Sequence, residues 1–86
     1  MTKLIQDVSI GNNIQKCRKA RGLTQEQVCA QMTILQRPIS QSHYAQIELG
    51  QKNIFVSDLI VLSRIFKVDF NTFFENIEPL EKTDKS

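Results

Sequence analysis

Apolar side chains recur every three to four residues along most of the chain, which is the period of an amphipathic α-helix. Between residues 10 and 21, Ile10, Ile14 and Cys17 fall on one helical face, and polar residues fill the other. No segment alternates apolar and polar residues in the way that a half-buried strand does. The pattern therefore predicts an all-α protein with about five helices around one small core.

Capping residues and helix breakers set the expected limits of the first two helices. Gly22 follows the first helix and can end it in a left-handed conformation. Thr24 and Gln27 have the spacing of a capping box, which predicts the start of a second helix. This helix can run on to Leu35, because Pro38 blocks further helix.

The third predicted helix is short and polar on one side. Ser40 caps it, and it extends over residues 41–49 until Gly50 ends it. Tyr44 and Ile47 share the face that is turned to the core. The opposite face carries small and polar side chains, which a buried helix would not need.

Two further helices complete the predicted core. Ser57 with Asp58 opens a fourth helix, and Asp69 or Asn71 opens a short fifth helix rich in phenylalanine. The apolar face of the fourth helix consists of Leu59, Ile60, Leu62, Ile65 and Phe66.

Length and composition fit one small globular domain. The chain has 86 residues, 41% of them apolar. No apolar run is long enough for a membrane span, and the first residues lack the apolar stretch of a signal peptide, so we expect a cytoplasmic location and no membrane contact. We expect an N-terminal arm over 1–8, a domain over 9–76 and a flexible tail over 77–86.

The distribution of charge is more informative than the net value of +2. Residues 1–53 carry seven Lys/Arg and three Asp/Glu, a net +4, whereas residues 54–86 carry four and six, a net −2. A polyanion would bind to the positive part. Ordinary scatter can produce the same imbalance, so charge alone does not decide the function.

The sequence carries no convincing metal site or catalytic group. Cys17, Cys29 and His43 lack metal-ligand spacing and a fourth ligand, so we expect two reduced, buried cysteines and no metal or cofactor. His43 could serve Ser40 or Ser42 only within one helix, and no acid is placed to orient it. We therefore expect no enzymatic activity.

The second and third helices with their connection form the arrangement of a helix-turn-helix, whose third helix enters the major groove of DNA. Glutamine can donate to and accept from an adenine edge, and serine can serve several bases. The expected base-reading residues are Gln41, Ser42, His43, Ala45 and Gln46. Expected contacts to the DNA backbone flank the helix at Thr24, Gln25, Arg37, Gln51, Lys52 and Asn53.

These residues resemble the Xre/Cro-type helix-turn-helix family of bacterial and phage regulators. The resemblance rests on the run Arg21-Gly22-Leu23-Thr24-Gln25-Glu26 and on the downstream Ile47-Glu48-Leu49-Gly50, and it covers about residues 10–75. It implies a five-helix, lambda-repressor-like fold that binds DNA, usually as a homodimer on a palindromic site.

The resemblance also implies roles for single residues. Gln25 resembles a glutamine that contacts the DNA backbone and braces the recognition helix. Arg18 and Glu48 match an arginine–glutamate pair that ties the first helix to the end of the third. The positions that match the family's base-reading residues are Gln41, Ser42 and Gln46.

Two departures from the family concern the ends of helices. The connection over 33–39 is about five residues longer than usual, and we expect the second helix to gain a turn while Ile34, Leu35 and Ile39 fill the gap. Arg37 then lies either near the DNA face or near a dimer partner. Lys67 replaces a common helix-ending glycine, so a left-handed residue there would carry strain.

The leading hypothesis is a sequence-specific regulator of transcription, a repressor, that binds double-stranded DNA without a small-molecule ligand. The alternative is a protein-interaction adaptor, or an antitoxin-like partner protein, built on the same fold. Val56, Val61, Phe70 and Phe73 favour the alternative, since so small a core cannot bury all four. The same side chains could instead form a homodimer interface through the fourth and fifth helices.

Overall fold

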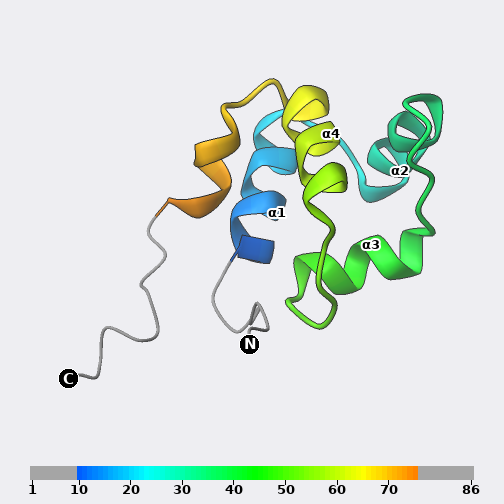
Figure 1. Cartoon of the computed structure of the whole chain (residues 1–86), viewed down its shortest axis with the longest axis horizontal. Helices are drawn as coiled ribbons and strands as arrows, with labels where there is room; N and C mark the ends of the chain where they lie inside the picture. Colours follow the sequence, from blue (N-terminus) through cyan, green and yellow to red (C-terminus); the bar gives the residue numbers. More distant parts are fainter. Residues whose placement is uncertain (1–9, 76–86) are drawn as a thin grey trace.

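The computed structural model describes residues 10–75, which form four α-helices, one 3-10 helix and no strand (Figure 1). The elements are α1 (Ile10–Ala20), α2 (Gln25–Ile34), α3 (Gln41–Glu48), α4 (Val56–Phe66) and the 3-10 helix η1 (Phe70–Phe74). The predicted all-α class is confirmed, although the fifth helix is a 3-10 helix. The predicted arm over 1–8 lies outside the described residues, as does the tail over 77–86.

The core lies where α1, α2, α3 and α4 meet and is closed on one side by η1. Ile14, Met32 and Leu62 are fully buried, and each contributes about 1.5–3 kcal/mol by removing its side chain from water. Phe73 of η1 is also fully buried and packs edge-to-face on Phe66, with ring centroids 6.3 Å apart. Asn13 holds η1 in place by donating to the carbonyl oxygen of Phe73 at 2.8 Å.

The predicted caps of α2 and α3 are present. The Thr24 hydroxyl accepts from the Gln27 amide at 3.1 Å, and the Gln27 side chain accepts from the Thr24 amide at 2.8 Å, which completes the capping box. The Ser40 hydroxyl accepts from the His43 amide at 3.1 Å and so begins α3. These local hydrogen bonds depend only on neighbouring residues, which is why the sequence reveals them.

The predicted start of α4 was wrong by one to two residues. The helix begins at Val56, and its N-cap is Phe55, which offers no side-chain hydrogen bond. Ser57 and Asp58 instead lie inside the first turn. Asp58 is engaged elsewhere, because its carboxylate accepts from Arg37 Nε at 2.6 Å.

All four α-helices end with the same backbone motif, in which a left-handed residue reverses the chain and the last carbonyls are satisfied. Glycines take the left-handed position after α1 and α3, with φ of 71° at Gly22 and 79° at Gly50. Gln36 and Lys67 take it after α2 and α4, with φ of 68° and 58°. Side chains at this φ cost free energy that glycine does not, so two of the four helix ends are strained.

The connection between α2 and α3 does not pack as predicted. The α2 helix ends at Ile34 with Leu35 as its C-cap, and the amide of Arg37 closes the motif on the Met32 carbonyl at 2.8 Å. Ile34 lies two residues after the buried Met32, on the opposite side of α2, and its side chain is 70% exposed. Leu35 is also exposed, and only Ile39 packs against the core.

The side chains that were predicted to be too many for the core differ in their exposure; they are Val56, Val61, Phe70 and Phe73. As predicted, not all four are buried, although Phe73 is completely buried. Val61 and Phe70 are half-buried against the core. Only Val56 is clearly exposed, so the apolar excess is smaller than predicted.

Candidate nucleic-acid interface

The two faces of α3 are separated as the helical period requires. Tyr44 and Ile47 are 0% and 2% exposed and anchor the helix on the core. Gln41 and Ser42 are exposed in its first turn, and Gln46 lies half-buried one turn further on. Ala45 is half-buried beside Gln46, so a nucleic acid meets no bulky side chain at this point.

The C-terminal end of α3 is fixed by a buried ion pair. Arg18 of α1 donates from Nε to Glu48 Oε2 at 2.7 Å and from Nη2 to Oε1 at 3.1 Å. Its Nη1 also donates to the Leu23 carbonyl at 2.9 Å. Only 1% of the Glu48 side chain is exposed. A charge so deeply buried is tolerated because it is paired and multiply hydrogen-bonded.

Gln25 joins this cluster from the start of α2. Its side-chain amide donates to Glu48 Oε1 at 2.9 Å, so it braces the end of α3. The capping box already uses the backbone amides of Thr24 and Gln27. Two backbone donors, those of Gln25 and Glu26, therefore remain for an anion at this helix N-terminus.

The electrostatics of the cluster favour the ionised form of Glu48. Burial by itself would raise the pKa of this carboxyl, but hydrogen bonds from Arg18 and Gln25 outweigh it and hold the pKa below its usual value. The neighbouring Tyr44 hydroxyl is buried beside the carboxylate without a well-formed hydrogen bond among the described residues. Burial raises the pKa of this phenol far above its usual range, so it stays neutral.

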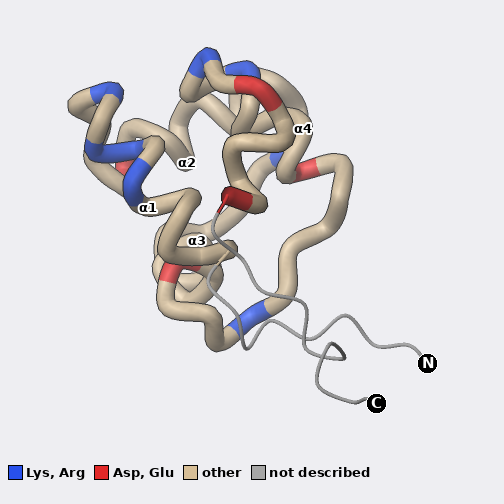
Figure 2. Tube along the Cα trace, turned by 90° about the vertical axis from the view of Figure 1, so that its left-hand side faces the viewer, with Lys and Arg blue, Asp and Glu red and all other residues tan. Residues whose placement is uncertain are grey.

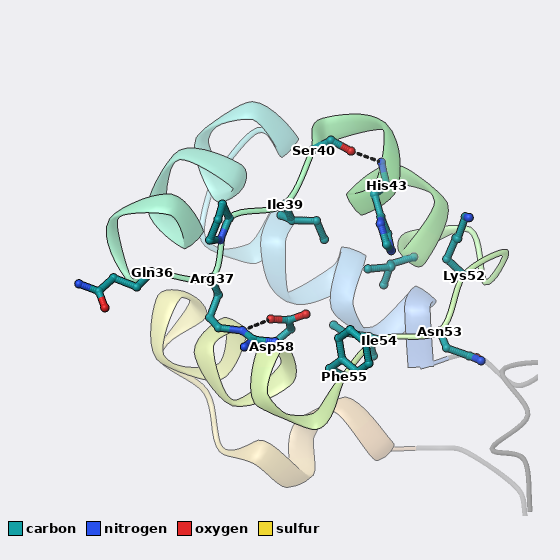
Figure 3. Close-up of a pocket in the computed structure, with 12 residues that line it drawn as sticks. Gln36, Arg37, Ile39, Ser40, His43, Lys52, Asn53, Ile54, Phe55 and Asp58 are labelled. Carbon is teal, nitrogen blue, oxygen red and sulfur yellow. Dashed lines mark hydrogen bonds and ion pairs between the residues drawn. The ribbon is translucent and has the colours of Figure 1, made fainter.

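His43 is an exposed residue in the first turn of α3. It extends into a pocket of about 530 Å³ that lies between the α2–α3 connection, α3 and the loop before α4 (Figure 3). Ile39 and Ile54 form part of the apolar lining of this pocket. Gln41 and Ser42, which are exposed in the same turn of α3, do not line this pocket.

The predicted contacts to the DNA backbone fall into three groups, the first being Thr24 and Gln25 at the start of α2. Gln51, Lys52 and Asn53 are exposed in the loop that follows α3, close to the helix. Arg37 is instead held by Asp58, and its side chain is 41% exposed (Figure 3). The carboxylate of Asp58 offsets the charge of Arg37, so Arg37 offers less to a phosphate than Lys52 does.

Two structural residues were not foreseen from the sequence. Asp58 was assigned to a helix cap and Asn13 to no role, yet Asp58 pairs with Arg37 and Asn13 ties η1 to α1. Both partners are far away along the chain. Helical periodicity and capping rules act over a few residues, so they give no indication of such contacts.

The described residues offer no alternative site for metal chemistry. Within residues 10–75 no three His, Cys, Asp or Glu side chains are grouped so as to hold a metal ion. Cys17 and Cys29 are free, buried thiols, and burial raises the pKa of each. In the same part of the chain, no helix is long and apolar enough to cross a membrane.

The order of α2, connection and α3, with the polar face of α3 turned outward, defines a helix-turn-helix protein. Comparison with known protein families matches residues 14–73 to the helix-turn-helix family, and the chain belongs to this family, that of the Xre/Cro-type regulators. Comparisons with the curated proteins and with the solved structures gave no match. The family assignment makes the protein a DNA-binding regulator in general terms.

Proposed function

We propose that the protein is a sequence-specific repressor of transcription in the cytoplasm that reads the major groove of double-stranded DNA with α3. One observation carries this proposal. The outward residues Gln41, Ser42 and Gln46 stand on a helix whose inner face is fixed by Tyr44, Ile47 and the buried Glu48. A helix held in this way presents short polar side chains to base edges without having to order itself on binding.

The chemistry of these side chains indicates what they would read. The side-chain amide of Gln41 or Gln46 can donate to N7 of adenine and accept from its N6 at the same time. Such a bidentate contact contributes about 1–3 kcal/mol of discrimination against other bases. Ser42 can act as donor or acceptor and discriminates less. We therefore expect a half-site in which adenines are the best-defined positions.

Phosphate contacts in this proposal come from few charges. Lys52 is the cation beside α3 that makes no ion pair within residues 10–75, and the free amides of Gln25 and Glu26 add neutral donors. Each neutralised phosphate adds about −0.9 to the slope of log affinity against log salt. A dimer with one such lysine per protomer should therefore show a shallow slope, of about −2.

The proposed assembly is a homodimer that places two α3 helices in successive major grooves, about 34 Å apart. Phe55 and Val56 at the start of α4 are 73% and 65% exposed, and Ile60 on the same helix is 40% exposed. These three side chains are the proposed dimer contact. Sedimentation equilibrium of the native chain and of Val56→Glu tests it, with a shift from dimer to monomer as the expected result.

The function is tested by selection of binding sites from random duplexes. We expect one enriched, two-fold symmetric motif. The double variant Gln41→Ala/Gln46→Ala should lose at least tenfold in affinity for that motif, whereas Gln31→Ala, the same chemical change on an exposed position of α2, should lose less than twofold. Recovery of no motif would contradict the proposal, and so would equal binding by the double variant and the native chain.

A further inference from the structure

A second groove lies at the opposite end of the molecule from α3. It has a volume of about 400 Å³ and is formed where the C-terminal parts of α1, α2 and α4 come together. Figure 1 shows the ends of α1 and α4 at the side of the domain away from α3, and Figure 2 shows most of the Lys and Arg positions there. The basic groove, as we call it, has a lining that includes Arg21, Leu23, Leu35, Arg64, Ile65 and Lys67.

The charge of the basic groove is of one sign. Arg21, Arg64 and Lys67 are all exposed, and no acidic residue lines the groove. None of the three makes an ion pair within residues 10–75. Three unpaired cations around one groove repel each other, so an anionic group bound between them would be favoured.

The favourable interaction of a cation with the C-terminal end of a helix explains the position of only some of the three cations. Arg64 lies in the last turn of α4, where a cation interacts favourably with the helix dipole. Lys67 is different, because it occupies the left-handed position that glycine would take at lower cost. Its backbone conformation works against stability, and its side chain adds a third cation to the groove.

The apolar part of the groove indicates which anion fits. Leu35 is 41% exposed, and Leu23 and Ile65 are half-buried beside it, so an apolar side chain could cover them. The groove is open along one side, whereas small-molecule sites enclose most of their ligand. DNA bound to α3 would lie at the other end of the domain. An open, basic groove with an apolar floor therefore suits a peptide segment better than a metabolite or the bound duplex.

We propose that the basic groove binds an acidic segment of a partner protein, one that places a leucine or phenylalanine on Leu35 and Ile65 and carboxylates beside Arg21, Arg64 and Lys67. Such a partner could occupy the groove while α3 remains on DNA. The proposal does not depend on base reading by α3, so either can fail without the other.

The experiment is a selection from a phage-displayed library of random twelve-residue peptides on the full chain, with counter-selection on the triple variant Arg21→Gln/Arg64→Gln/Lys67→Gly. We expect enrichment of peptides that combine Asp or Glu with Leu or Phe. Fluorescence anisotropy with an enriched peptide should show a two- to fivefold loss of affinity in Arg21→Gln, Arg64→Gln and Lys67→Gly, as expected for exposed charge pairs. Replacing the peptide's apolar residue by serine should cost about tenfold.

Lys67→Gly separates binding from stability. The variant relieves the left-handed strain, so its thermal midpoint should rise by about 3–6 °C while its peptide affinity falls. If Lys67 served only to end α4, the midpoint would rise and peptide affinity would not change, which would overturn the proposal.

Three other results would also overturn it. The first is a selection that yields no peptides combining acidic and apolar residues. The second is a set of amide NMR shifts that map the peptide to α3. The third is displacement of the peptide by a similar concentration of octanoate, a small carboxylate with an apolar chain. As a control, Gln41→Ala/Gln46→Ala should leave peptide affinity unchanged, and Arg64→Gln should leave affinity for a selected duplex unchanged.

Discussion

The two ends of α3 are held in different ways. At the C-terminal end, Glu48 accepts hydrogen bonds from Arg18 and Gln25 in a buried cluster, and the backbone of α3 touches α1 at Gly11. At the N-terminal end, the helix is held by the Ser40 cap and by a long connection whose apolar residues are largely exposed.

This difference shows where the orientation of α3 is decided. The buried cluster joins α1, α2 and α3 at one point and fixes the helix axis there. The first turn, which carries Gln41 and Ser42, depends on fewer contacts and on the half-exposed pair of Arg37 with Asp58. Regions with few buried contacts open at lower free-energy cost, so the N-terminal end should be the more adaptable of the two.

The largest effect should come from breaking the buried pair. Arg18→Ala leaves the Glu48 carboxylate buried and unpaired, which should lower the free energy of unfolding by about 3–5 kcal/mol, measured by urea denaturation. The matched variant Arg18→Met/Glu48→Leu removes both charges and should recover most of this loss. A loss below about 1 kcal/mol in Arg18→Ala would show that the C-terminal end is not the rigid one.

The next effect concerns the contact between α1 and α3. A methyl group on Gly11 would lie 2.7 Å from the Glu48 carbonyl oxygen and even closer to that of Ile47, and both atoms belong to the backbone. Gly11→Ala should therefore lower the free energy of unfolding by about 1–3 kcal/mol through overpacking. Asn12→Ala, at the exposed neighbouring position, should change it by less than about 0.5 kcal/mol. Equal effects of both substitutions would contradict a tight contact between α1 and α3 at Gly11.

Acid should weaken the C-terminal end selectively. The folded-state pKa of Glu48 is depressed, so its contribution to stability is complete above the unfolded-state value of about 4.3 and is lost as the pH falls through the lower folded-state value. Urea midpoints measured between pH 2 and pH 7 should fall less steeply below about pH 4.3 in Glu48→Gln than in the native chain. Parallel curves for the two proteins would contradict this assignment.

The smallest effect should come from the N-terminal end. Arg37→Gln removes a pair that is partly screened by solvent, so the free energy of unfolding should fall by only about 0.2–1 kcal/mol. Asp58→Asn should have a similar effect, and the double variant should show a coupling within that range. A loss as large as that of Arg18→Ala would mean that both ends of α3 are equally rigid.

The features that depend on neighbouring residues were predictable from the sequence. Periodicity separated Tyr44 and Ile47 from Gln41 and Ser42, and the capping box at Thr24 was apparent because its hydrogen bonds are local. The placement of Arg18 beside Glu48 was expected from a resemblance, since no local rule joins residues 30 positions apart.

What the sequence did not reveal depends on how segments meet in space. The chain reverses after α2 at Gln36, a left-handed residue at a position where glycine is usual. The role of Asp58 follows from the approach of Arg37 across the α2–α3 connection. The base-reading and phosphate-binding roles remain predictions, because they concern a partner molecule.

The division of α3 into two faces has a consequence for how such a protein changes over generations. Glu48 accepts the hydrogen bonds that hold the end of α3, and Tyr44 and Ile47 make its buried contacts. Gln41 and Ser42 therefore contribute little to folding. Mutations at these two positions are then nearly free of a stability cost. If α3 reads DNA as proposed, a duplicated copy could acquire a new operator by a few such changes while its fold persists.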